Sequence, residues 1–124
     1  MLEVADHAGV AKAMQNMDAG IFIIKPAYSK IASAPTKLGE FLGCGVPCLG
    51  NANVGDIADI IVGEKVGVVL SSFDADSIRV AVEELVCLTK QEGIKAHCRD
   101  VALRYFSLKE GVRSFDRIYR ELVV

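Results

Sequence analysis

The sequence predicts an α/β fold, in which about three parallel strands with flanking helices are followed by a helical C-terminal tail. Three short apolar runs rich in β-branched residues, at positions 20–24, 46–49 and 66–70, have the pattern of buried strands. Stretches with helical apolar spacing separate these runs. Strands that alternate with helices favour right-handed crossovers and a parallel sheet. The chain therefore resembles half of a doubly wound, Rossmann-like domain, and residues 1–124 form one domain.

The first part of the chain predicts a helix followed by a strand. Val4, Ala8, Ala11 and Met14 recur at steps of three and four residues, which indicates an amphipathic helix over about residues 3–17. The apolar run at 20–24 predicts a strand that is buried on both faces. A polar loop over residues 27–34 then leads into the central helix.

The central stretch, residues 33–50, predicts a helix, a tight turn and a strand. Pro35 suits the first turn of a helix, where a missing N–H costs little. Gly43, Gly45 and Pro47 end the helix before the strand at 46–49. The apolar face of this helix consists of Leu38, Phe41 and Leu42.

The remaining chain predicts one more strand and four helices. Asp56 and Asp74 are expected to cap the helices that follow them, and Ser107 with Glu110 forms a capping-box pattern. The two C-terminal helices are too long for a minimal crossover and are expected to pack back over another part of the structure. The apolar stripes of the four helices are Ile57, Ile60 and Ile61; Ile78, Ala81, Val82, Leu85 and Leu88; Ile94, Cys98, Val101, Ala102 and Tyr105; and Val112, Phe115, Ile118, Tyr119 and Leu122.

Composition narrows the class of protein. The chain has 124 residues, 52% hydrophobic and 24% charged, with a net charge of −2, which fits a globular domain. No basic patch is evident, which disfavours nucleic-acid binding. The apolar runs are too short to cross a bilayer and the N-terminus lacks a signal-peptide pattern, so a cytoplasmic location is expected, at the membrane surface if the parent enzyme works there.

The four cysteines and two histidines do not form a metal-binding or catalytic pattern. Cys44, Cys48, Cys87 and Cys98 are interpreted as small apolar core residues of a reduced protein, although a disulfide stays open. His7 and His97 lie on predicted helices without a nucleophile or carboxylate at a suitable spacing. No Ser-His-Asp, Cys-His or Walker-type signature is present. No metal and no catalytic residue are therefore assigned.

The helix that begins near Pro35 is the main candidate for ligand binding. Ligands of open α/β sheets bind beyond the carboxyl ends of the strands, and this helix starts there. The backbone N–H groups of Thr36, Lys37 and Leu38 could hold a phosphate, and the carboxylate of Glu40 could accept hydrogen bonds from a ribose diol. Glu40 and Lys37 could equally form an ordinary surface ion pair, since they lie three residues apart.

A long ordered set of motifs resembles a known enzyme family. The segments 18–20, 25–26 and 29–30, then Ala-Pro-Thr-Lys-Leu-Gly-Glu at 34–40 and Gly-Cys-Gly-Val-Pro at 43–47, are similar to the C-terminal half of retaining glycosyltransferases with the GT-B fold (the group 1, or family 4, type). Residues 54–56, 67–76, 106–107 and Tyr119 continue the match nearly to the end of the chain.

The resemblance implies a site for a nucleoside-diphosphate sugar, which is a donor substrate rather than a cofactor. Glu40 corresponds to the second glutamate of the family's Glu-x7-Glu motif, which holds the donor ribose. The loop carrying Ser29 and Ser33 and the N–H groups of residues 36–38 would face the diphosphate and the sugar.

Two departures from the family pattern bear on activity. Ala32 stands where the family has its first glutamate, which contacts the transferred sugar. The acceptor-binding N-terminal domain and the first strands of the donor domain are not in these 124 residues. The fragment by itself is therefore expected to be inactive as a hexosyl-type transferase.

Three further interpretations follow from the sequence. The chain could be a non-catalytic, truncated module that binds a nucleotide weakly or serves in assembly. A phosphoacceptor receiver-like domain ranks last, because no aspartate ends a central strand. The first strand is expected to have an open edge, which predicts a homodimer through that edge.

Overall fold

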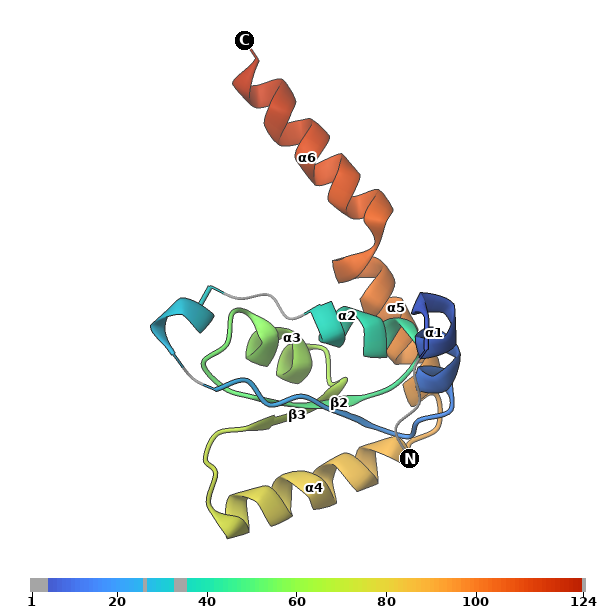
Figure 1. Ribbon diagram of the computed structural model, residues 1–124, viewed down its shortest axis with the longest axis vertical. Coiled ribbons are helices and arrows are strands. Elements are labelled where there is room, and N and C mark those ends of the chain that lie inside the picture. The colour runs from blue at the N-terminus through green and yellow to red at the C-terminus, as the bar shows by residue number, and fades with distance from the viewer. Residues whose placement is uncertain (1–4, 26, 33–35, 124) are drawn as a thin grey trace.

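The fold is a three-layer α/β arrangement around a small parallel sheet, as the sequence predicted (Figure 1). The computed structural model describes residues 5–25, 27–32 and 36–123. The strand order is β1 (Gly20–Ile21), β2 (Cys48–Asn51) and β3 (Gly67–Leu70). Gly20 lies opposite Cys48, and Cys48 lies opposite Gly67. The central strand β2 therefore pairs on both sides.

Helices cover the two faces of the sheet unequally. Helices α2 (Thr36–Gly43) and α3 (Ile57–Gly63) lie on one face, with α1 (His7–Gln15) and α5 (Ile94–Phe106) beside α2, whereas α4 (Ala75–Thr89) lies on the other face (Figure 1). The larger core cluster lies on the side of α2, α3 and α5, and the smaller one lies under α4. The larger cluster includes Leu38, Leu42, Cys48, Val54, Ile57, Ile61, Val66, Cys98 and Val101, and the smaller one consists of Leu49, Leu70, Ala81 and Leu85.

Strand β1 differs from the expectation that both of its faces would be buried. Ile21 and Ile23 are 60% and 49% exposed. Helix α4 packs against β2 and β3, and no described element covers these two isoleucines on the same face. The apolar run correctly indicated a strand, but a run does not tell which faces are covered.

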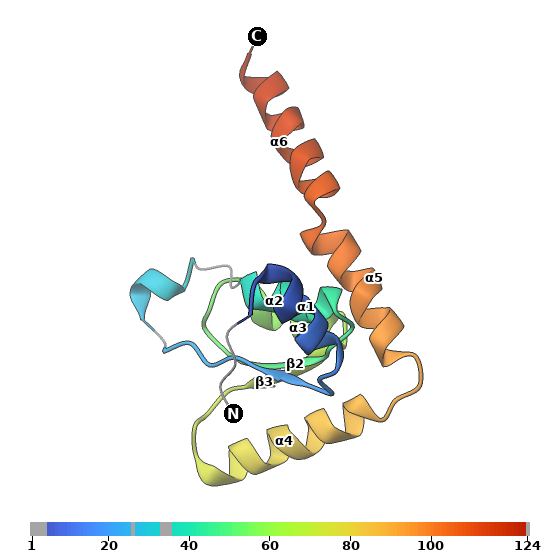
Figure 2. The same ribbon diagram turned by 45° about the vertical axis from the view of Figure 1, so that its right-hand side comes forward.

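The C-terminal helix α6 (Leu108–Leu122) also differs from expectation. It extends away from the body instead of packing back over it, and both views show this (Figures 1 and 2). It packs against α5, and none of its side chains is fully buried. The apolar stripe exists as the spacing predicted, but it faces solvent. Tyr105 at the end of α5 is likewise half exposed.

Side-chain caps fix the starts of three helices. The N–H groups of Gly9 and Ser77 donate to the carboxylates of Asp6 and Asp74 at 2.8 and 2.9 Å, so α1 begins at His7 rather than near residue 3. The N–H of Glu110 donates to Ser107 Oγ at 3.2 Å. The cap predicted for Asp56 is wrong, because this residue precedes α3 without a side-chain capping hydrogen bond.

Among the described residues, no helix is both long and apolar enough to cross a bilayer. The short 3₁₀ helix η1 (Tyr28–Lys30) lies beyond the end of β1.

Among the glycines of the sheet, Gly67 in β3 approaches a neighbouring backbone most closely, and this backbone is that of Cys48 in β2. A Cβ atom added at Gly67 would overlap the carbonyl oxygen of Cys48, which is backbone and has no room to move. We expect Gly67→Ala to destabilise the fold by roughly 3 kcal/mol or more, because the two strands would have to separate. Urea unfolding followed by circular dichroism measures this change.

Gly63→Ala is the matched control for that experiment. Gly63 ends α3 and has open space around the position of a Cβ atom. This change should be neutral or stabilising by up to about 1 kcal/mol. Equal effects of the two substitutions would contradict the proposed close approach.

Candidate functional site

The candidate site lies at the carboxyl edge of the sheet. Helix η1, the start of α2 and the loop after β2 lie on this side of the molecule (Figure 1). Crevices at this edge are where open α/β sheets bind ligands. The edge is therefore the place to test the residues that the sequence predicted.

Asn51 shapes this edge at the end of β2. Its side chain is buried, and its Oδ1 atom accepts a hydrogen bond from the Ile24 N–H at 2.8 Å. Its Nδ2 atom donates to the carbonyl oxygens of Ile24 at 2.8 Å and of Ala52 at 3.2 Å. The side-chain amide thus extends the pairing between β1 and β2 beyond the regular ladder, and it holds the chain that leads to η1.

The three residues at the start of α2 differ in what they can offer a ligand. Thr36 and Lys37 are exposed, whereas the Leu38 side chain is 2% exposed and belongs to the core. The first N–H groups of an α-helix have no acceptor within the helix. Leu38 could therefore contribute its N–H but not its side chain, whereas Thr36 and Lys37 could contribute both.

Glu40 lies on the exposed side of α2, one turn after Thr36. Its Oε2 atom is 2.6 Å from Lys37 Nζ, and the two side chains are 43% and 54% exposed. The structure therefore contains the ion pair between Lys37 and Glu40 that their three-residue spacing allowed. Glu40 also borders a hollow of about 250 Å³ between α1 and α2, which is lined by His7, Val10, Ala11, Met14, Gly39, Gly43 and Cys44 as well.

The polar loop before α2 is described only in part. Ser29 and Lys30 are exposed in η1, and Lys25 and Ala32 are exposed on either side of it. Ser33, Ala34 and Pro35 lie outside the described residues, so the structure does not place the predicted Ser33 contact. Ser29 has no hydrogen-bond partner among the described residues.

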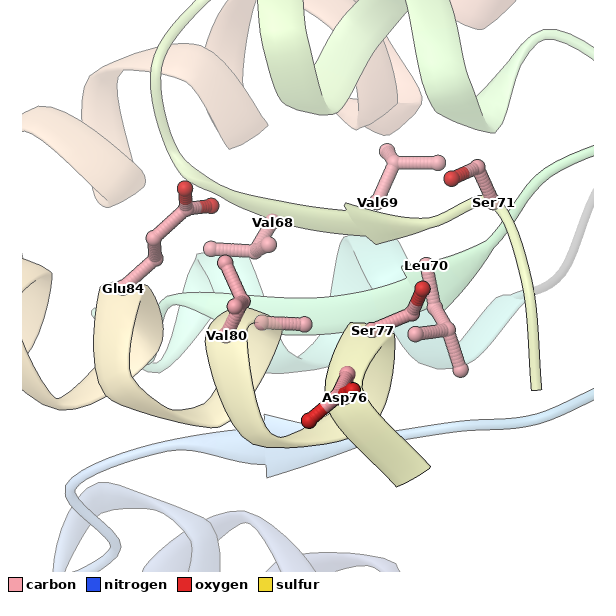
Figure 3. A pocket seen from close by; sticks show the side chains of 9 residues that line it. Val68, Val69, Leu70, Ser71, Asp76, Ser77, Val80 and Glu84 are labelled. Carbon is pink, nitrogen blue, oxygen red and sulfur yellow. The ribbon is translucent and has the colours of Figure 1, made fainter. Parts of the chain in front are cut away.

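A second hollow, of about 350 Å³, runs between the outer edge of β3 and α4 (Figure 3). Figure 3 shows Val80 and Glu84 pointing from α4 towards β3, with Asp76 and Ser77 at the start of the helix. This hollow is unsuitable for a diphosphate, because its lining contains two carboxylates, Asp76 and Glu84, and no basic residue.

Asp74, which caps α4, has its pKa lowered by hydrogen bonds from Ser72 and Ser77.

A polar network that the sequence did not indicate joins α3 to α5. The Glu64 carboxylate accepts hydrogen bonds from Arg104 at 2.8 Å and from Tyr105 at 2.6 Å, and its carbonyl oxygen lies 2.6 Å from His97 Nε2. The hydrogen bonds from Arg104 and then from Tyr105 lower the pKa of Glu64. The network lies outside the candidate site, and we interpret it as structural.

The cysteines are free thiols in different environments. Cys48 and Cys98 are buried, as expected, and burial raises the pKa of Cys98 to about 11. Cys44 is half-buried, and Cys87 is exposed, so the core assignment is wrong for Cys87. Within the described part of the chain, no three His, Cys, Asp or Glu side chains lie close enough together to hold a metal ion.

Comparison with known proteins gives no match, whether with protein-family models, curated proteins or solved structures.

Substitution of Asn51 tests whether its side chain holds the backbone of Ile24 at this edge of the sheet. We expect Asn51→Ala to lower the free energy of unfolding by about 1–3 kcal/mol, because it leaves the N–H and carbonyl of Ile24 without partners. Hydrogen exchange at the Ile24 amide should become faster. Asn53→Gly is the control, since Asn53 is exposed with a φ of 64° that glycine adopts easily, and it should leave both quantities unchanged or slightly improve stability. Slow exchange at Ile24 in Asn51→Ala would contradict the bridging role.

Proposed function

We propose that the chain is the nucleotide-sugar-binding part of a retaining GT-B glycosyltransferase, which transfers a sugar from a nucleoside-diphosphate donor to an acceptor. The ordered motifs at 34–40 and 43–47 support this proposal. The observation that carries it is the exposed position of Glu40 on α2, one turn from the helix start and beside a hollow.

The start of α2 would hold the diphosphate. The N–H groups of Thr36, Lys37 and Leu38 are the first of an eight-residue helix, and an anion near a helix N-terminus gains about 0.3–1 kcal/mol from the helix dipole. Lys37 adds a positive charge at the same end. Ser29 and Ser33 would donate further hydrogen bonds from the preceding loop.

Glu40 would bind the ribose. Its carboxylate can accept hydrogen bonds from both hydroxyl groups of the diol. The ion pair with Lys37 competes for this carboxylate, but an exposed pair contributes only about 0–1 kcal/mol, so two ribose hydroxyls can displace it. Released from Glu40, the Lys37 ammonium would be available to the diphosphate.

The chain would supply only part of the catalytic site. Catalysis in such enzymes takes place between two domains, where stabilisation of the leaving diphosphate lowers the barrier. Ala32 is exposed where the family pattern has a glutamate, and we assign no catalytic residue here. The acceptor domain would come from another polypeptide segment. We place the parent enzyme in the cytoplasm, at the membrane surface if its acceptor is there.

A non-catalytic binding or assembly module is the second candidate. The hollow beside Glu40, about 250 Å³, is smaller than the roughly 300–1,000 Å³ of ordinary ligand pockets. The ion pair already satisfies the Glu40 carboxylate. Both observations fit a weak or incomplete nucleotide site. The homodimer through the open edge of β1 also remains a proposal.

Titration with UDP, GDP and their sugars tests the role of Glu40. We expect Glu40→Ala to raise the Kd of the preferred nucleotide at least about tenfold, because hydrogen bonds to a charged group are lost. The penalty should vanish for the 2′,3′-dideoxy form of the same nucleotide, which lacks the diol. Isothermal calorimetry measures both effects.

Glu83→Ala is the control, because Glu83 is also an exposed glutamate in a helical ion pair, with Arg79 at 3.1 Å. It should bind as the wild type does. Binding that is unchanged in Glu40→Ala would remove the ribose role. A wild-type chain that binds none of these nucleotides would favour the assembly module.

The isolated chain should show little or no transferase activity, since one side of the catalytic cleft is not part of these 124 residues. Release of UDP or GDP from the sugar donor, with and without simple sugar acceptors, is the measurement. Turnover that copurifies with the protein and is lost in Glu40→Ala would contradict this expectation.

A further inference from the structure

The outer edge of β3 offers backbone groups for pairing. Among the described strands, β3 pairs with β2 alone. The Ala52 N–H donates to the Leu70 carbonyl at 3.0 Å, so the backbone of Leu70 faces β2. Backbone groups of a strand point to its two sides in turn, and the N–H and carbonyl groups of Val69 therefore point away from β2.

A trough follows this edge between β3 and α4. It consists of the hollow shown in Figure 3 and an adjoining hollow of about 400 Å³. The two hollows share Val68, Val80 and Glu84 in their linings, so they are continuous, and we call them together the β3 trough. From Asp76 to Leu88 the trough follows α4 for roughly 18 Å, which is the length of about five or six residues of a strand.

The charge in the β3 trough has one sign. Among the described residues that line it, Asp76, Glu83 and Glu84 are acidic and none is basic. Arg79 lies outside the lining and pairs with Asp76 at 3.7 Å and with Glu83 at 3.1 Å. Glu84 points from α4 towards β3 (Figure 3) and forms no ion pair with a residue that the structure describes. The trough is therefore suited to a basic side chain.

Asp76, Val80 and Glu84 form a regular row in the trough. They are four residues apart on α4, which places them on one side of the helix at intervals of about 6 Å. Alternate residues of an extended strand lie about 6.6 Å apart and point to the same side. A strand beside β3 would thus place three alternate side chains over this row, and a basic, an apolar and a basic side chain would match it.

We propose that the β3 trough binds an extended segment of another protein, which adds a strand to the outer edge of β3. Its backbone pairs with Val69, and an apolar side chain contacts Val80. Lys or Arg side chains two positions before and after it contact Asp76 and Glu84. In this kind of recognition, backbone hydrogen bonds supply affinity and alternate side chains supply specificity. Glu40 lies on α2 at the other face of the sheet, so the proposal does not depend on the donor site.

Other occupants fit this lining less well. An ordinary strand of a parallel sheet is apolar and buried on both faces, and it would cover Glu84 without supplying a counter-charge. This argument applies equally to such a strand from elsewhere in the same polypeptide. Two copies paired edge to edge at β3 would bring like charges together. A metal ion is disfavoured, because within the described part of the chain no three His, Cys, Asp or Glu side chains lie close enough to hold one.

Isothermal calorimetry with the end-blocked peptide Thr-Lys-Thr-Val-Thr-Lys-Thr tests the proposal. We expect the wild type to bind this lysine peptide and not the version with glutamate in place of both lysines. Glu84→Lys should weaken binding of the lysine peptide at least about fivefold, because attraction becomes repulsion. The same variant should bind one of the two peptides with a single lysine-to-glutamate change more tightly than the wild type does.

Glu121→Lys is the matched control, because it makes the same charge change at an exposed glutamate of α6, outside the trough. It should bind the lysine peptide as the wild type does, and circular dichroism checks the helical content of both variants. Hydrogen exchange provides a second measurement. The amide of Val69 should exchange fast in the free chain and at least about tenfold more slowly in the complex, because strand pairing protects it.

Four results would overturn the proposal. A wild type that does not bind the lysine peptide would leave the carboxylates as a guard against strand pairing. Equal weakening by Glu84→Lys and Glu121→Lys would indicate attraction by overall charge. Fast exchange at Val69 in the complex would indicate binding without strand pairing. Slow exchange at Val69 before peptide is added would mean that this edge is already paired, by a second copy or by another segment of the polypeptide.

Discussion

The burial of β2 is the constraint on which the rest of the structure depends. All four residues of this strand are buried, and the strand pairs on both sides. The larger core packs on one of its faces and the smaller core on the other. Any movement of β2 would therefore disturb both cores at once.

The position of Glu40 follows from the same strand. The chain turns sharply between α2 and β2 at Gly45, whose φ of 78° is left-handed, and the N–H of Val46 donates to the Phe41 carbonyl at 2.9 Å. This turn leaves little freedom between the helix and the strand. The start of α2 is therefore fixed relative to the carboxyl edge of the sheet, where Asn51 holds the end of β1.

The sequence predicted the positions of the helices and strands better than it predicted which of their faces are covered. Continuous apolar runs and helical spacing located the three strands and the helices because both patterns are local. They could not show that Ile21 and Ile23 lie open or that α6 leaves the body, since a pattern indicates which face is apolar and not what covers it. Asp56 was expected to cap α3, but the backbone there does not bring its carboxylate to the helix N–H groups.

The residues of the candidate site were predictable where they lie close together within one helix. The residues at the start of α2 and Glu40 share one helical turn, and their exposure follows from the apolar face on the other side. Asn51 was not identified, although an amide two residues after the buried run at 46–49 could have suggested a role at the strand end. Glu64, Arg104 and Tyr105 meet only through the tertiary fold, so spacing could not reveal their network.

The open face of β1 and the candidate site are physically connected through β1. Ile21 and Ile23 lie on this open face, in one wall of an apolar groove between β1 and α4, and the next residue, Ile24, is held by Asn51 at the edge where η1 begins. A strand that is covered on one face only is free to fluctuate on its open side, and local stability decreases where few apolar contacts are made. The order of η1, which carries Ser29, therefore depends on how firmly β1 is held.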